Sequence, residues 1–237
     1  MPLAHRHRIA ALAAFAVALP FAGRATAGEA VHYSLDPVHT RVMFAIEHAG
    51  FSKAIGTVSG STGRLVFDPE DWSSAKLQAS VPMARVDLGD AGWNKATLAG
   101  NLLDVEDHPT AEFVSTRVEP IAPDRASVYG TLTLRGVTRE IVLDVILNAA
   151  KRHPLPPFRR TVGFSATAML SRKDFGIDAW PSVIGNAVEL RIEAEATRSH
   201  ADDDGDTHAP DGPVGASSSP HAADIDATPQ PPTEPAP

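Results

Sequence analysis

Asp36 and His39 come nearest to a catalytic arrangement among the side chains of this sequence. A carboxylate that holds an imidazole can support acid–base chemistry, because histidine titrates near neutral pH. The pair also begins at an Asp-Pro turn, where an aspartate side chain commonly accepts hydrogen bonds from the residues that follow it. We therefore expect a hydrogen bond that stabilises the turn rather than acid–base work.

No other group of residues has the form of a known catalytic or metal-binding motif. The sequence contains no G-x-S-x-G, H-E-x-x-H, P-loop or G-x-G-x-x-G pattern. Its histidines form no i, i+4 pair on a helix, which argues against a zinc site. We expect a protein that is not an enzyme, with no catalytic residue, no metal and no required cofactor. A triad assembled from separate strands stays open.

The 237-residue chain has no cysteine, which excludes disulfides, cysteine–zinc sites and thiol catalysis. The fold must then depend on a hydrophobic core. No basic patch suggests nucleic acid, so we expect no such partner.

Residues 1–27 have the composition of a secretory signal peptide. A basic run at 5–8 precedes an apolar segment at 9–22 and an Ala-Thr-Ala sequence at 25–27. The apolar segment is too short for a stable transmembrane helix. We expect cleavage after Ala27, export to the periplasm and no stable membrane anchor.

Residues 199–237 have the composition of a disordered tail. They include eight acidic residues and eight of the 20 prolines but no lysine or arginine, and the eight negative charges equal the formal net charge of −8. So few large apolar side chains cannot offset the entropy lost on ordering. We expect an acidic, proline-rich extension with no fold of its own.

Residues 28–198 have the size of one domain and a period of two over most of their length. Alternation is clearest at 188–196, at 128–134 and at 162–170, where one face of each segment is apolar. Further strands are expected at 31–36, 42–46, 53–67, 75–84, 110–120 and 138–148. A helix is expected at 91–103, capped by Asp90. The pattern predicts an all-β fold, an antiparallel barrel or sandwich.

Small residues are frequent on the apolar faces of these strands. They are Gly130, Ala166, Ala168, Ala194 and Ala196. In a closed barrel, small inward residues can leave a cavity for a ligand. They can equally taper the barrel ends or permit close packing of sheets, and the pattern alone leaves these alternatives open.

Four motifs, in order, resemble those of the YceI-like polyisoprenoid-binding proteins. DPVHT at 36–40 resembles a D-x-x-H-[ST] opening, and HPTAEF at 108–113 resembles a [YH]-P-x-x-x-F segment. GTLTLRGVTR at 130–139 is similar, almost letter for letter, to G-x-L-T-[IL]-x-G-V-T-[KR]. SRKDFG at 171–176 resembles an R-x-D-F-G turn. Together they extend the resemblance from about Tyr33 to Ala196.

The resemblance implies a lipocalin-like antiparallel barrel of about eight strands with one short helical connection. It also implies a periplasmic protein that holds a polyisoprenoid, an isoprenoid quinone or another long amphiphile inside the barrel. One departure concerns the helical connection, where the family often has R-D-x-H-L and this chain has WNKATL at 93–98. A head-group role of that Arg or His cannot be transferred, and Lys95 is considered only as a partial substitute.

We therefore expect a carrier that sequesters a long-chain isoprenoid or similar lipid, with a bound lipid or quinone. The residues expected to line the interior share one parity within their strands: Phe44, Phe113, Leu132, Leu134, Val162, Phe164, Leu190 and Ile192. Each of them could equally be ordinary packed core. The alternative is a stress-related interaction module with incidental lipid binding, and a homodimer through an exposed strand edge is possible.

Overall fold

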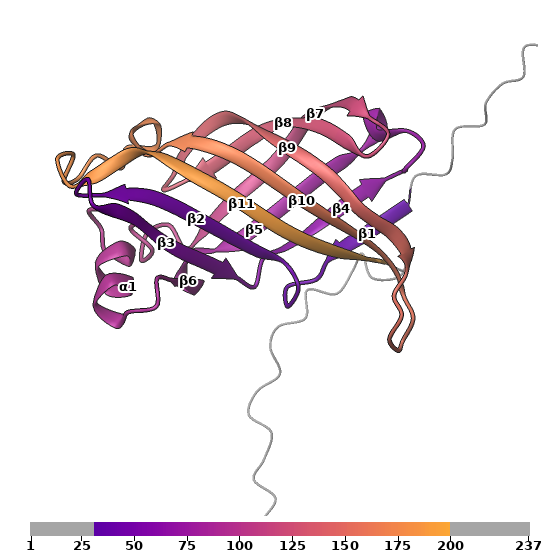
Figure 1. Ribbon diagram of the computed structural model, residues 1–237, viewed down its shortest axis with the longest axis horizontal. Helices are drawn as coiled ribbons and strands as arrows, with labels where there is room; N and C mark the ends of the chain where they lie inside the picture. Colours follow the sequence, from indigo (N-terminus) through magenta and orange to yellow (C-terminus); the bar gives the residue numbers. More distant parts are fainter. Residues whose placement is uncertain (1–30, 200–237) are drawn as a thin grey trace, which may run out of the picture. The chain divides into compact units, whose positions relative to one another are not determined.

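The computed structural model describes residues 31–199 (Figure 1). The expected signal peptide, 1–27, and the expected tail, 199–237, lie outside the described residues except for Ser199. The strands are β1 (Val31–Leu35), β2 (Arg41–His48), β3 (Ser52–Ser59), β4 (Thr62–Phe67), β5 (Lys76–Pro82), β6 (Val86–Asp87), β7 (Thr110–Ala122), β8 (Arg125–Leu134), β9 (Val137–Arg152), β10 (Arg160–Ser171) and β11 (Ile184–Arg198). The helices are α1 (Ala91–Leu98) and the 3₁₀ turns η1 (Trp72–Ser74), η2 (Met83–Arg85) and η3 (Arg172–Phe175).

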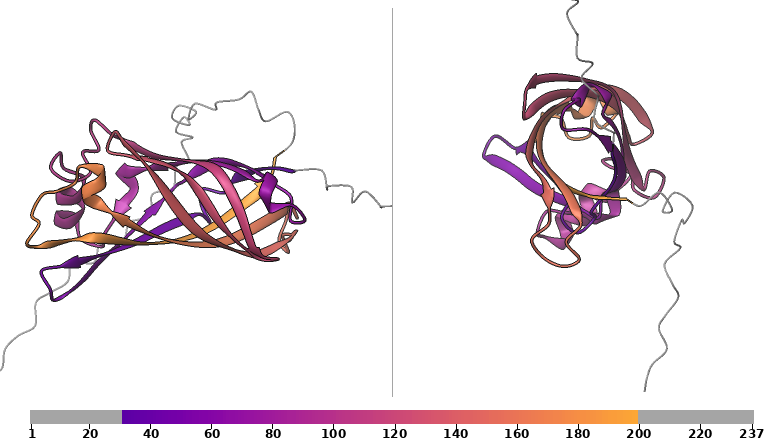
Figure 2. Two further views of the ribbon diagram at one scale, coloured as in Figure 1. Left: turned by 90° about the horizontal axis from the view of Figure 1, so that it is seen from above. Right: turned by 90° about the vertical axis from the view of Figure 1, so that its right-hand side faces the viewer.

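These strands form a closed antiparallel barrel. The order is β1-β4-β5-β7-β8-β9-β10-β11, and β1 pairs with β11 to close the ring (Figure 2). β2, β3 and β6 continue the ring beyond β1, β4 and β5, since β2 pairs with β11 and with β3. The chain breaks briefly at 36–40, at 60–61 and at η2. Eleven segments therefore occupy eight positions, and the expected eight-stranded barrel is confirmed.

Alternation in sequence places one face of each strand inside this barrel. In β11, Leu190 pairs with Ala168 of β10 and with Phe44 of β2. Side chains paired across antiparallel strands lie on the same face of the sheet. The apolar parity of three strands is thus brought together on one inner surface, while the charged parity of β11 faces outward.

The α-helix of the described residues, α1, is shorter than expected. The predicted N-terminal cap is confirmed: the Asp90 carboxylate accepts a hydrogen bond from the backbone N–H of Trp93 at 2.9 Å. The helix ends at Leu98 rather than at 103, because Ala99 has an extended backbone and the next residues form a turn. The backbone N–H of Leu103 reaches back to the carbonyl of Thr97. Apolar spacing alone could not show this reversal of the chain.

Candidate functional site

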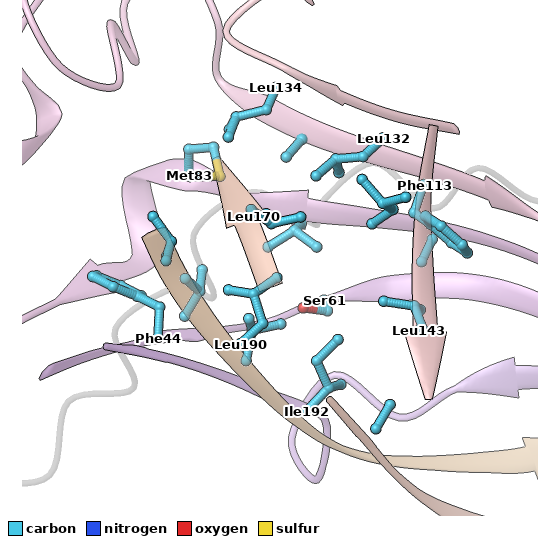
Figure 3. Close-up of a pocket in the computed structure, with 18 of the residues that line it drawn as sticks. Phe44, Ser61, Met83, Phe113, Leu132, Leu134, Leu143, Leu170, Leu190 and Ile192 are labelled. Carbon is cyan, nitrogen blue, oxygen red and sulfur yellow. The ribbon is translucent and has the colours of Figure 1, made fainter. Parts of the chain in front are cut away.

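The inside of the barrel holds a cavity of about 470 Å³. Pockets that bind small molecules commonly measure about 300–1,000 Å³, so the volume suits a ligand. Its walls are almost entirely aliphatic and aromatic, and Figure 3 shows such side chains reaching inward from opposite strands. An apolar interior of this kind can hold a hydrocarbon chain without specific polar contacts.

Seven of the eight residues expected inside the barrel line this cavity. They are Phe44, Phe113, Leu132, Leu134, Phe164, Leu190 and Ile192. They come from β2, β7, β8, β10 and β11, which are far apart in sequence. The structure brings them together, while their contact with a ligand stays a prediction.

Val162, the eighth residue expected inside the barrel, does not line the cavity. It is 1% exposed and belongs to a packed cluster with Tyr33 and Phe67. It lies near the start of β10, where its neighbours across the sheet are Ala150 and Ala196. At this end of the barrel, side chains fill the interior. Parity was correct for Val162, but depth along the barrel decided its role.

A cluster of three aromatic rings stands where the cavity meets this packed region. Phe67 contacts Trp72 and Phe164 edge to face, with ring centroids 5.1 and 5.3 Å apart. Trp72 and Phe164 are themselves 6.2 Å apart in the same orientation. Such contacts fix ring positions. The cluster therefore gives the cavity a firm wall at this end.

Some small residues of the inner face leave room in the cavity, and others permit close packing. Ala166 and Ala194 line the cavity and leave room in it. Ala168 and Ala196 instead pack in or against the core. The space beside Gly130 is taken by the ring of Phe113. Small residues thus serve both a cavity and close packing.

Arg172 is a buried cation that also lines the cavity. Its guanidinium donates to three backbone carbonyls, Ile177 at 2.7 Å, Gly185 at 2.8 Å and Ile184 at 2.9 Å. Burial lowers the pKa of Arg172 from its ordinary value, while the charge of Asp178 acts in the opposite direction. Three carbonyls held by one side chain fix the loop that follows η3 against the start of β11.

The helix α1 contributes to the wall of the cavity. The rings of His48 on β2 and Trp93 on α1 are 5.2 Å apart, and both residues line the cavity. Ala96 and Thr97 of α1 line it as well. Lys95 is exposed and is not among the lining residues, so nothing in its position supports a head-group role.

Comparison with known proteins agrees with the barrel and its motifs. Residues 33–196 match the model of the YceI-like domain. The chain belongs to the YceI-like family. A relative, a UPF0312 protein of Pseudomonas aeruginosa, is 34% identical over 73% of this chain and 91% of its own.

Two solved structures share the YceI-like fold. BcnA of Burkholderia cenocepacia has a TM-score of 0.62 and 20% identity, covering 69% of this chain and 99% of its own. A polyisoprenoid binding domain from Saccharophagus degradans has a TM-score of 0.55 and 15% identity, covering 71% of this chain and 99% of its own. At these identities the likeness shows the fold.

The Asp36–His39 pair of this YceI-like chain forms the expected turn. His39 Nδ1 lies 2.8 Å from Asp36 Oδ2, and the other carboxylate oxygen accepts bonds from the N–H groups of Val38 and His39. The hydrogen bond and charge of Asp36 raise the pKa of His39. Burial acts to raise the pKa of Asp36, but these hydrogen bonds outweigh it and lower that pKa. Neither residue lines the large cavity.

Within residues 31–199, no three His, Asp or Glu side chains gather closely enough to hold a metal ion. No helix in the same range is long and apolar enough to cross a membrane.

Several lining residues were missed by sequence reasoning. Leu143 lies on β9, where the expected strand at 138–148 already carried an alternating pattern that could have identified it. Met83 lies on the 3₁₀ turn η2 and Ser61 at the break between β3 and β4. Both continue an alternating pattern that could have identified them: Met83 has the parity of Val81 in the expected strand at 75–84, and Ser61 has that of Leu65 in the expected strand at 53–67.

Proposed function

We propose that this YceI-like protein binds a long-chain isoprenoid or similar amphiphilic lipid in the interior of its barrel and carries it in the periplasm. The observation that carries the proposal is the apolar cavity of about 470 Å³ enclosed by the eight strand positions. Its walls offer dispersion contacts along a chain, and its few charged lining residues are Glu47, Lys76 and Arg172.

The energy of transfer is sufficient for useful binding. A lipid that buries ten methylenes gains roughly 8 kcal/mol, at about 0.8 kcal/mol for each CH₂. Lost translation, rotation and chain freedom remove several kcal/mol of this gain. Binding then needs no specific polar contact, although such contacts would select among lipids.

The relatives support the same proposal. A structural neighbour from Saccharophagus degradans is a polyisoprenoid binding domain with the same fold. The cavity of this chain is lined mainly by apolar side chains, and the described residues show no metal cluster. We propose a binding role without catalysis.

The first test is mass spectrometry of an organic extract from the purified protein. A lipid recovered in stoichiometric amount supports the proposal and identifies the ligand. An empty protein that also refuses added isoprenoid quinones and polyprenyl phosphates contradicts it, and would favour the interaction-module alternative.

Two variants on one strand test whether the lipid lies inside the barrel. Phe164 of β10 lines the cavity, whereas Thr167 of the same strand is exposed. Phe164→Glu puts a charge against the lipid chain and should abolish retention, since an unpaired buried carboxylate is strongly unfavourable. Thr167→Glu is the matched control and should retain lipid. Equal retention by a folded Phe164→Glu protein would contradict an interior site.

A further inference from the structure

Ser61 stands at the break between β3 and β4 and faces the cavity. The preceding Gly60 has a φ of +79°, and its N–H donates to the carbonyl of Pro37 in the neighbouring break at 3.2 Å. The two breaks are thus joined, and they hold Ser61 at an inner position with only 2% of its surface exposed.

The hydroxyl of Ser61 has no hydrogen-bond partner among residues 31–199. Figure 3 shows it among the aliphatic side chains that line the cavity. A buried polar atom nearly always has a partner, because leaving it unpaired costs about 1–3 kcal/mol. This isolated hydroxyl in an apolar chamber therefore requires an explanation.

Two other hydroxyls on the cavity wall, those of Thr40 and Ser115, form hydrogen bonds within the protein. Thr40, in the neighbouring break, donates from Oγ1 to the carbonyl of Glu195 at 3.3 Å. Ser115 on β7 accepts from the N–H of Leu77 at 2.8 Å. Both line the same cavity. Ser61 differs from them in keeping its donor and its acceptor free toward the interior.

We propose that the Ser61 hydroxyl donates a hydrogen bond to an uncharged oxygen of the bound lipid, so that the preferred ligand carries a carbonyl or ether oxygen within the barrel. This inference rests on the proposed lipid-binding function and deepens it. It assigns to Ser61 the selection of an oxygen-bearing chain over a pure hydrocarbon of the same shape.

The surroundings of Ser61 decide that the oxygen is uncharged. A carboxylate or phosphate there would lose its hydration in a cavity lined mainly by apolar side chains, with one neutral hydroxyl in return. The cationic lining residues lie elsewhere. Lys76 pairs with Val66, five residues beyond Ser61 and so about 16 Å along a strand that rises about 3.3 Å per residue. Arg172 is engaged by carbonyls beside β11.

The test compares two isoprenoid probes of nearly identical shape, phytone and pristane. Phytone is a methyl ketone, and pristane has a methyl branch in place of the carbonyl oxygen. Their affinities are measured for lipid-stripped wild-type protein, for Ser61→Ala and for Ser59→Ala. Ser59 lies two residues away in β3 and does not line the cavity, so it is the matched control.

Wild-type protein and Ser59→Ala should prefer phytone to pristane, and in Ser61→Ala this preference should fall about three- to tenfold, the range of one net hydrogen bond. An unchanged preference in Ser61→Ala overturns the inference. If wild-type protein binds neither probe, the lipid-binding function itself fails. That result is distinct from binding both probes without discrimination, which overturns only the role of Ser61.

A stability measurement separates a ligand role from a structural one. In the lipid-stripped protein, Ser61→Ala should not lower the melting temperature, because no protein group loses a bond. Thr40→Val should lower it, since Thr40 loses its hydrogen bond to the carbonyl of Glu195, which then keeps only the N–H of Asp36 as a donor. A fall in Ser61→Ala as large as that of Thr40→Val would show that Ser61 is bonded within the protein, and would overturn the inference.

Discussion

The ring of Phe113 occupies the place where a side chain on Gly130 would stand. A Cβ added to Gly130 would lie 2.4 Å from Cζ of Phe113 and 2.5 Å from the backbone carbonyl oxygen of Val114. Gly130 pairs with Ser115 on β7, so the glycine of β8 lies beside the strand that carries the ring. The glycine therefore fixes one wall of the cavity.

Gly130→Ala should destabilise the protein by about 1–3 kcal/mol, the usual cost of overpacking. The phenyl ring could turn aside, but the carbonyl of Val114 belongs to the strand and cannot. Urea denaturation measures the change. Gly163→Ala on β10 is the control, because its added Cβ would meet nothing within 4 Å. It should be neutral or slightly stabilising, and equal losses in both variants would contradict the steric explanation.

Arg172→Gln should destabilise the protein by about 2–5 kcal/mol, because three backbone carbonyls lose a buried donor. Thermal or urea unfolding of the lipid-stripped variant measures the loss. Arg191→Gln is the comparison: Arg191 forms an ion pair with the carboxylate of Glu193, but its side chain is 63% exposed. Its removal should cost less than about 1 kcal/mol. Similar losses of unfolding free energy in the two variants would show that the buried guanidinium of Arg172 stabilises the protein no more than an exposed one.

The Asp36–His39 turn should add a pH-dependent increment to stability. The pKa of His39 is raised, so its contribution is complete below the ordinary histidine value of about 6.5 and disappears as pH rises through the higher folded value. The pKa of Asp36 is lowered, so its contribution is present above about pH 3.9 and disappears as pH falls through the lower folded value.

The difference in unfolding free energy between wild type and His39→Gln should therefore be largest between about pH 4 and 6.5 and shrink toward about pH 9. It should stay below about 1 kcal/mol, because the His39 side chain is more than half exposed and water screens the pair. Urea denaturation across this range measures it. A difference that does not vary with pH would mean that the imidazolium is not stabilised by Asp36.

Replacing a small lining residue by a large one should reduce the amount of bound lipid without unfolding the barrel. Ala194 of β11 lines the cavity, and Ala194→Phe adds a ring to the space that a lipid chain would occupy. Ala187 of the same strand is exposed, so Ala187→Phe is the matched control. Extraction and mass spectrometry should find lipid lost from the first variant and kept in the second. Full retention in Ala194→Phe would argue against binding in this cavity.

The strands could be predicted because their information is local. Val188, Leu190 and Ile192 alternate with charged residues, and a half-buried strand follows directly from that period. The Asp36–His39 bond and the Asp90 cap are equally local, and both are present. The predicted end of the helix was wrong, because the true end depends on how the residues after Leu98 fold back. No periodic pattern in the sequence records this.

The sequence by itself determined the strands, the inward parity of each one, and the motifs of a YceI-like barrel. Only the tertiary structure decided which inward residues meet empty space. Val162 and Phe164 share a parity, yet one is packed and the other lines the cavity, because the filling of a barrel changes with depth. Space at any level depends on the volumes of side chains from every strand around the ring, as Phe113 beside Gly130 shows. The isolated position of Ser61 has the same origin, since it lies in a break between strands and its surroundings come from strands distant in sequence.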